Sequence, residues 1–321
     1  MHRMNILPRL PLLLALALYP VGSQAAELEW VTEAGKSLFV EGAKVERLAT
    51  GMQFLEGPVW ITKDGGYLVF SDIPANELKK WTRSGGVSLF RYPSKNANGN
   101  TTDTKGRLVT AEHSGRRITF TSKKENVKPL VSDFNGKKFN SPNDLVVKSD
   151  ASVWFTDPDY GLPKGEAKEL DGNYVFRFDE KKKSLDAVVT DFDKPNGLCF
   201  SPDEKFLYVA DSGAPHHIRR FEVREDGTLA GGKVFCVINP GGPDGIRCDQ
   251  EGRLWSSAGN GVQVFSPEGV LIARLNLPET AANLCFGGED GKTLFITART
   301  SLYAVKTRTT AALRPDPAPK N

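Results

Sequence analysis

The stretch KPNGLCFSPDEKFLYVADS, residues 194–212, contains the pattern that decides the fold. A short apolar run, NGLCF, leads into the polar turn PDEK, and a second apolar run, FLYVADS, follows the turn. Short runs rich in β-branched and aromatic residues, bounded by turn residues, are typical of β-strands. Asp and Gly suit such turns because they tolerate left-handed backbone angles. The stretch therefore predicts two adjacent strands joined by a tight turn.

The same pattern occurs six times along the chain, and a third strand-like run follows each copy. No stretch after the first 25 residues shows sustained helical periodicity. Six units of about 45 residues predict a six-bladed β-propeller. The central runs are YLVFSD (67–72), RLVTAEH (107–113), SVWFTDP (152–158), FLYVADS (206–212), RLWSSAG (253–259) and TLFITAR (293–299). The candidates for a fourth strand are residues 87–90, 127–132, 185–190, 233–238 and 270–275.

The sixth unit lacks a fourth strand, and the chain from Trp30 to Leu48 is the candidate that would close the ring with both termini. We therefore predict an all-β protein with a single six-bladed propeller domain over residues 26–312. The proline-rich end, residues 313–321, is expected to fray. A β-sandwich and a pair of smaller barrels are the alternative folds, and the regular spacing of the units disfavours both.

Residues 1–25 have the composition of a secretory signal peptide. Arg3 and Arg9 flank the start of the segment, the apolar run Leu10–Tyr19 follows, and small residues lead to a cleavage site after Ala25. The apolar run is about half of the ~20 residues that a spanning helix needs, which disfavours an uncleaved anchor. We expect an exported protein, periplasmic or secreted, with no membrane span in its mature form.

The composition, with 39% hydrophobic and 25% charged residues, is ordinary for a globular protein. The formal charge is only +3 and no basic block is present, which disfavours a nucleic acid partner. Each cysteine lies in an apolar, strand-like run, so buried thiols are favoured over the disulfides that export would permit. The oligomeric state is left open by the sequence. The cysteines are Cys199, Cys236, Cys248 and Cys285.

Polar residues recur at one position, where the first strand of each unit opens. In a propeller these strands line the central channel, so the side chains are expected to converge at one end of the axis. Carboxylate and amide oxygens in one place suit Ca²⁺ best, with Mg²⁺ or Mn²⁺ as alternatives and Zn²⁺ as a less natural choice. Turn chemistry would explain any single Asn-Gly or Asp-Gly pair, but not the repetition. The six positions hold Glu56, Asn98, Asn143, Asn196, Asp244 and Ala282.

Two further residues are candidates for the same end of the channel. His113 ends the central run of the second unit, and both a substrate donor and a solvent-exposed loop residue fit that place. Tyr160 follows the central run of the third unit and is a candidate for a pocket wall. Asp72, Asp157 and Asp211 close central runs, and we interpret them as turn caps.

Several of these motifs resemble the gluconolactonase, senescence-marker and luciferin-regenerating family of propellers. The resemblance covers nearly the whole chain after residue 25, and residues 97–119 are especially similar to the bacterial gluconolactonase branch. It rests on LEGPVW (55–60), ANGNTTDTKGRLVTAEHSGRRIT (97–119), NSPNDLVVKSDASVWFTDPDYGL (140–162), KPNGLCFSPDEKFLYVADS (194–212) and GGPDGIRCDQEGRLW (241–255).

The resemblance implies a divalent ion at the centre of the propeller. The family's metal ligands match Glu56, Asn196 and Asp244, with Asn143 beside them as a ligand or a substrate contact. The family's proposed general base matches Asp244. The animal branch carries an arginine two residues before the matched Asn143, whereas this chain has Ser141, which weakens the transfer of an exact substrate.

The favoured function is metal-dependent hydrolysis of a sugar lactone, such as an aldonolactone, to the corresponding acid. The metal would polarise the carbonyl group, and Asp244 would act as the general base or serve only as a ligand. One alternative is a calcium-dependent phosphotriesterase of the diisopropyl-fluorophosphatase type. Another is a non-catalytic binding propeller with a structural metal. The expected substrate contacts are Asn98, His113, Asn143 and Tyr160.

Overall fold

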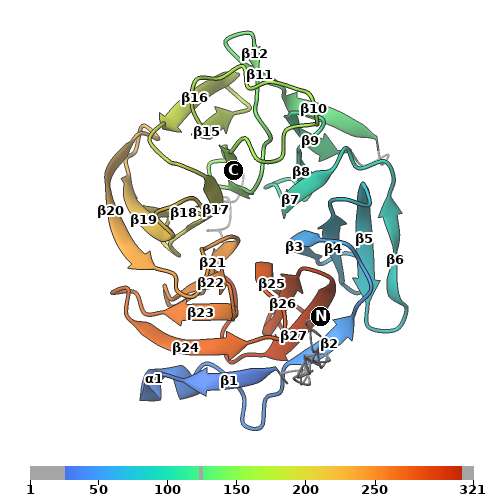
Figure 1. The fold of residues 1–321 in the computed structure, drawn as a ribbon, viewed down its shortest axis with the longest axis vertical. Coiled ribbons are helices and arrows are strands. Elements are labelled where there is room, and N and C mark those ends of the chain that lie inside the picture. The colour runs from blue at the N-terminus through green and yellow to red at the C-terminus, as the bar shows by residue number, and fades with distance from the viewer. Residues whose placement is uncertain (1–25, 123–125, 313–321) are drawn as a thin grey trace, which may run out of the picture.

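The computed structural model describes residues 26–122 and 126–312. The predicted signal peptide and the predicted frayed tail lie outside the described residues. Six antiparallel sheets radiate from a central axis (Figure 1), which confirms the all-β, six-bladed propeller. In the part of the chain that the structure describes, no helix has the length and apolar character needed to cross a bilayer.

The first three blades each contain four antiparallel strands in chain order, with the first strand innermost (Figure 1). Blade one is β3 (Leu55–Ile61), β4 (Tyr67–Asp72), β5 (Glu77–Thr82) and β6 (Gly86–Arg91). Blade two is β7 (Ala97–Thr102), β8 (Leu108–Glu112), β9 (Arg117–Thr121) and β10 (Val127–Val131). Blade three is β13 (Leu145–Val147), β14 (Val153–Asp157), β15 (Tyr174–Asp179) and β16 (Ser184–Val189).

Blades four to six repeat this order, and all five predicted fourth strands of the propeller are present. Blade four is β17 (Pro195–Phe200), β18 (Phe206–Asp211), β19 (His217–Val223) and β20 (Leu229–Val237). Blade five is β21 (Ile246–Cys248), β22 (Leu254–Ala258), β23 (Gly261–Phe265) and β24 (Leu271–Asn276). Blade six has β25 (Ala281–Gly287), β26 (Thr293–Ala298) and β27 (Ser301–Lys306) from this end of the chain.

The N-terminal segment closes the ring. Strand β2 (Glu46–Ala49) pairs antiparallel with β27, so the predicted closure by this segment is confirmed. Strand β1 (Glu27–Trp30) adds a fifth strand to blade five by pairing with β24, which the repeat pattern did not predict. The remaining elements of the described residues are α1 (Glu33–Lys36), β11 (Asp133–Phe134) and β12 (Lys137–Lys138).

The core lies between neighbouring blades, where apolar side chains of facing sheets pack together. Phe155 and Phe176 of blade three are fully buried, stack with ring centroids 5.2 Å apart, and belong to one cluster with Val109 of blade two. All four cysteines are buried and free, as the sequence favoured. The core thus holds the blades side by side and leaves the channel to the inner strands.

Three aspartates at the ends of second strands hold the segments that lead into the inner strands. Asp72 accepts a hydrogen bond from the backbone N–H of Phe54 at 3.2 Å, and Asp211 accepts one from Lys194 at 2.9 Å. Asp157 accepts the N–H of the residue at position 140 at 2.8 Å. These bonds reach 17 or 18 residues back along the chain, so they anchor the incoming segment instead of capping a local turn as predicted. They fix where each inner strand begins.

Candidate active site

A cavity of about 710 Å³ opens at one end of the central channel. All seven residues that the sequence singled out for the site line it, although they come from five blades. Five of them form what we call the polar column, one residue at the start of each inner strand or just before it. The polar column is Glu56, Asn98, Asn143, Asn196 and Asp244, and the other two residues are His113 and Tyr160.

The inner strands are distorted at the polar column. In β3 the pairing register shifts between Glu56 and Val59, and β7, β17 and β25 shift at the same place. Such a bulge leaves an extra residue unpaired and disturbs the alternation of side chains between the two faces of a strand. Two successive residues of an inner strand are therefore able to face the channel.

Glycine follows the polar column in four blades because neighbouring inner strands approach closely there. A Cβ on Gly197 would lie 2.2 Å from the carbonyl oxygen of Asp244. Without that atom, the Gly197 N–H donates to this oxygen at 3.0 Å, and Gly99 donates in the same way to Asn143 at 2.8 Å. The Asn-Gly and Asp-Gly pairs thus serve the approach of adjacent strands. The four glycines are Gly57, Gly99, Gly197 and Gly245.

A second set of contacts, the hydroxyl collar, joins each of three blades to the next. The collar consists of Ser71, Thr156 and Ser212, which lie in the second strands or directly after them. The Ser71 hydroxyl donates to the carbonyl of Asn98 at 2.6 Å, and the Thr156 hydroxyl donates to that of Asn196 at 2.8 Å. Sequence reasoning missed the collar, although a hydroxyl residue near the end of the second strand is a visible signal.

Hydrogen bonds from the amide nitrogens orient the asparagines of the polar column. Asn98 donates through Nδ2 to Oδ1 of Asn143 at 2.9 Å, and Asn143 donates to the hydroxyl of Tyr160. Asn196 donates to the hydroxyl of Ser212 at 2.8 Å. The Oδ1 atoms of Asn98 and Asn196 are buried and lack a hydrogen-bond partner among the described residues. These two oxygens are available to a ligand.

The two carboxyl groups of the polar column disfavour each other's charge. Burial, together with the charge of nearby Asp144, raises the pKa of Glu56 to about 7 against the opposing effect of hydrogen bonds from Asn283 and Gly57. Burial, and then the charges of Glu56 and Asp144, hold the pKa of Asp244 well above its usual range. A cation between the carboxyl groups would favour their charged forms.

The donor set fits a hard cation better than a soft one. Over residues 26–122 and 126–312, no group of three His, Cys, Asp or Glu side chains is placed to hold a metal. The polar column instead combines two carboxyl groups with amide oxygens, of which two are buried and unpartnered. Oxygen-only sets of this kind suit Ca²⁺, which accepts carboxylates and neutral amide oxygens alike.

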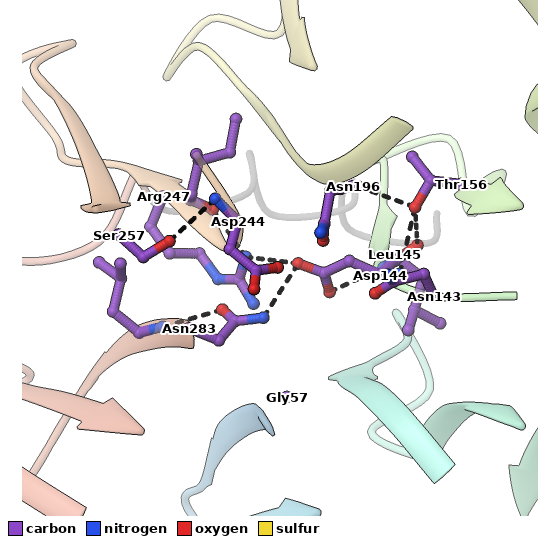
Figure 2. Close-up of polar contacts among 12 residues, drawn as sticks. Gly57, Asn143, Asp144, Leu145, Thr156, Asn196, Asp244, Arg247, Ser257 and Asn283 are labelled. Atoms are coloured by element: carbon purple, nitrogen blue, oxygen red, sulfur yellow. Dashed lines mark hydrogen bonds and ion pairs between the residues drawn. The ribbon is translucent and has the colours of Figure 1, made fainter. Parts of the chain in front are cut away.

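Three residues that the sequence did not suggest form what we call the inner cluster beside the polar column (Figure 2): Asp144, Arg247 and Asn283. Asp144 and Asn283 occupy the position that is glycine in the other four blades. Asn283 donates through Nδ2 to Glu56 at 3.0 Å. The same Nδ2 donates to Asp144 at 3.3 Å (Figure 2). Arg247 donates to the same Asp144 oxygen at 3.3 Å. Blade six, whose aligned residue is Ala282, thus reaches the site through Asn283.

His113 is buried, so the solvent-exposed alternative for this residue is wrong. Its Nε2 lies 3.3 Å from Nδ2 of Asn98, and its ring lies edge-on to Tyr160 with centroids 6.4 Å apart. Burial lowers the pKa of His113 to about 4, which leaves the imidazole neutral near pH 7. A neutral ring beside the Asn98 amide accepts a hydrogen bond through Nε2.

Ser141, which stands where the animal branch has an arginine, is fully buried. Its hydroxyl donates to the carbonyl of Pro158 at 2.5 Å and accepts the N–H of Gly161 at 3.0 Å. These bonds hold the loop that presents Tyr160 to the cavity. The serine therefore supports the pocket wall in this chain.

The fold and the site together define a six-bladed propeller whose channel opens into a pocket of carboxyl and amide oxygens. Residues 54–300 match the family described as the SMP-30/Gluconolactonase/LRE-like region, and the chain belongs to this family. A gluconolactonase from Zymomonas mobilis subsp. mobilis is 36% identical over 293 residues, covering 83% of this chain and 82% of the relative.

Two further relatives span most of the chain. A 6-deoxy-6-sulfogluconolactonase from Pseudomonas putida is 27% identical and covers 76% of this chain and 82% of its own. The solved structure of a gluconolactonase from Xanthomonas campestris superposes with a TM-score of 0.83 at 34% identity. It covers 87% of this chain and 94% of its own.

Proposed function

We propose that the protein is an enzyme that hydrolyses a sugar lactone to the aldonic acid. The observation that carries the proposal is the convergence of the polar column, His113 and Tyr160 on one cavity. Relatives described as gluconolactonases, which cover most of the chain, support the same reaction. The amides, hydroxyls and neutral imidazole of the cavity suit a ligand that carries several hydroxyl groups.

A divalent cation belongs to this proposal, with Ca²⁺ as the first choice and Mg²⁺, Mn²⁺ or Zn²⁺ as alternatives. Glu56, Asn196 and Asp244 would hold it, with Asn143 as a fourth ligand or a substrate contact. The free Oδ1 of Asn98 offers a further amide oxygen at the same place. When bound, the cation supplies Lewis-acid polarisation of the ester carbonyl.

The chain's own residues would move the protons. Asp244 would hold a water molecule and take one of its protons as the water oxygen bonds to the carbonyl carbon. The ring C–O bond then breaks, and the departing ring oxygen recovers the proton from Asp244, which yields the hydroxy acid. The Ser257 hydroxyl accepts the Asp244 backbone N–H at 3.0 Å and so fixes the base. Asn98, His113, Asn143 and Tyr160 would orient the substrate.

The cellular location is part of the proposal. The N-terminal segment has the features of a cleaved secretory signal, so we place the enzyme outside the cytoplasm, in a periplasm or in the medium. Its substrate would then be a lactone present in that compartment.

The test is hydrolysis of glucono-1,5-lactone, which is measured as proton release. The protein is first stripped of metal, and each cation is then added back separately. The uncatalysed opening of this lactone is subtracted. We expect metal-restored turnover that falls by about 10²–10⁴ in Asp244→Asn, the range for loss of a general base. An aliphatic lactone and a fluorophosphate run in parallel. Turnover of the fluorophosphate alone would overturn the lactonase proposal in favour of a phosphotriesterase.

A further inference from the structure

A third buried carboxylate lies beside the polar column. Asp144 is fully buried and accepts hydrogen bonds from Arg247, from Asn283 and from the backbone N–H of Leu145 at 2.9 Å (Figure 2). Nη1 of Arg247 lies 3.3 Å from Oδ2 of Asp144, so the two residues form an ion pair. The residue therefore contributes a negative charge to the channel.

Asn283 connects this charge to the proposed cation site. Its Nδ2 donates both to Oε2 of Glu56 at 3.0 Å and to Oδ2 of Asp144 at 3.3 Å. The two carboxylates therefore lie on either side of one amide nitrogen. A cation held by Glu56 would be attracted by the charge of Asp144 across the Asn283 amide. Because the site is buried, water would screen this attraction only weakly.

Arg247 offsets part of this charge from the other side. It donates to Asp144 at 3.3 Å and to the carbonyl of Ile246 at 2.6 Å. Glu56, Asp144 and Asp244 supply three negative charges and Arg247 one positive charge, so a divalent cation would neutralise the group. A trivalent ion would leave an excess of positive charge, and a monovalent ion a deficit.

We propose that the Asp144–Arg247 pair sets the charge preference of the cation site, although neither residue is a ligand. The inference rests on the proposed function, because it presupposes a cation at Glu56 and Asp244. Asp144 strengthens cation binding, Arg247 weakens it, and together they match the site to a divalent ion. Asn283 is the positioning residue that holds Glu56 at a fixed place relative to the pair.

The test compares two ions of similar size and different charge, Ca²⁺ and Tb³⁺, by calorimetry and terbium luminescence. Because Coulomb energy scales with ion charge, we expect Asp144→Asn to weaken Ca²⁺ binding by about tenfold and Tb³⁺ binding by about thirtyfold. Arg247→Met should shift both affinities in the opposite direction. The ratio of the two affinities then moves about threefold down in one variant and about threefold up in the other. A purely structural disturbance would change both ions alike.

Two controls keep the outcome decisive. The double variant Asp144→Asn, Arg247→Met removes the pair together, so it should fold and return the wild-type ratio even where a single variant unfolds. Glu204→Gln removes a buried carboxylate that lines a second cavity with Arg247 and none of the polar column, and it should leave the ratio unchanged. Equal ratios in wild type and folded single variants would overturn the inference. Absence of Ca²⁺ and Tb³⁺ binding by the wild type would instead overturn the proposed cation site.

Discussion

The two ends of the central channel lie along the same inner strands, but they differ in how their polar atoms are satisfied. At the active-site end, the amide oxygens of Asn98 and Asn196 are buried without a partner among the described residues. At the other end, a smaller cavity of about 230 Å³ is lined largely by apolar side chains and thiols, such as Val59 and Cys285.

Polar residues at the second cavity have their partners within the protein. Asn100 donates to the carbonyl of Gly57 at 3.0 Å and accepts from Thr110 at 2.9 Å. Glu204 accepts from the backbone N–H of Ser149 at 2.8 Å. An unsatisfied buried polar group costs about 1–3 kcal/mol, a cost that a bound ligand at Asn98 and Asn196 would remove. The comparison teaches that the same repeat builds both ends of the channel, while unpartnered amide oxygens distinguish the end that we propose to bind the cation.

The largest difference in cation affinity is expected between two residues in neighbouring blades. Glu56 lies at the active-site end of the channel, and Cys285 lies at the other end. Glu56→Gln keeps the shape of the side chain but removes its charge, and we expect cation affinity to fall about 100-fold, or about 2.7 kcal/mol. Cys285→Ala should leave that affinity unchanged while lowering the free energy of unfolding by about 1 kcal/mol, because it only empties core volume. Calorimetry gives the affinity, and urea denaturation gives the stability. Similar affinity losses in both variants would remove the distinction between the ends.

A smaller effect should separate two members of the hydroxyl collar. Ser212→Ala removes the partner of Asn196 Nδ2 and also a hydrogen bond to the Pro243 carbonyl. The Asn196 amide then loses its fixed orientation, and we expect cation affinity to fall about fivefold for the loss of that hydrogen bond of ~1 kcal/mol. Ser71→Ala is the matched control, because its hydroxyl contacts no side chain of the polar column. It donates to the backbone carbonyl of Asn98 and accepts from Nδ2 of Asn100 at 2.9 Å. Its affinity should change less than that of Ser212→Ala. Equal losses of cation affinity in both variants would mean that the collar only supports the packing of the blades and does not orient the Asn196 amide.

The polar column was predictable from the sequence because a repeat aligns equivalent residues. Glu56 and Asp244 belong to different blades, yet their equal place in the unit is enough to bring them together at the axis. His113 and Tyr160 were also placed by their position after a second strand. None of these inferences needs more than the propeller and the alternation of strands and turns.

The inner cluster was not predictable in the same way. Strict alternation sends Asn283 away from the channel when Ala282 faces it, and only the register shift in β25 breaks that rule. Asp144 precedes its strand, so no alternation applies to it. The pairing of β1 with blade five could not be predicted from the repeat either. Glu27 and its partner Asn276 are far apart in the sequence and come together only when the ring closes.

The smallest effect on activity is expected at His113, where the pocket needs an acceptor rather than a charge. His113→Gln keeps a side-chain acceptor but changes its position, so we expect KM to rise by at most about fivefold, the contribution of one hydrogen bond. Because the imidazole is already neutral, activity of the wild type should show no titration of this residue between pH 6 and 8. Steady-state kinetics across that range is the measurement.

His113 should also affect how the free energy of unfolding depends on pH in the acid range, because its burial disfavours a charged imidazole in the folded protein. The pKa of His113 is lowered from 6.5 to about 4 by burial, so the unfolded chain takes up a proton between these values and the folded chain does not. Stability therefore falls as the pH drops from 6.5 towards 4, by at most about 1.4 kcal/mol for each pH unit. His113→Gln cannot titrate and should lose this part of the slope in urea denaturation at each pH. An unchanged slope would mean that the folded protein carries a charged imidazole, and then the hydrogen bond from Asn98 to Nε2 could not exist.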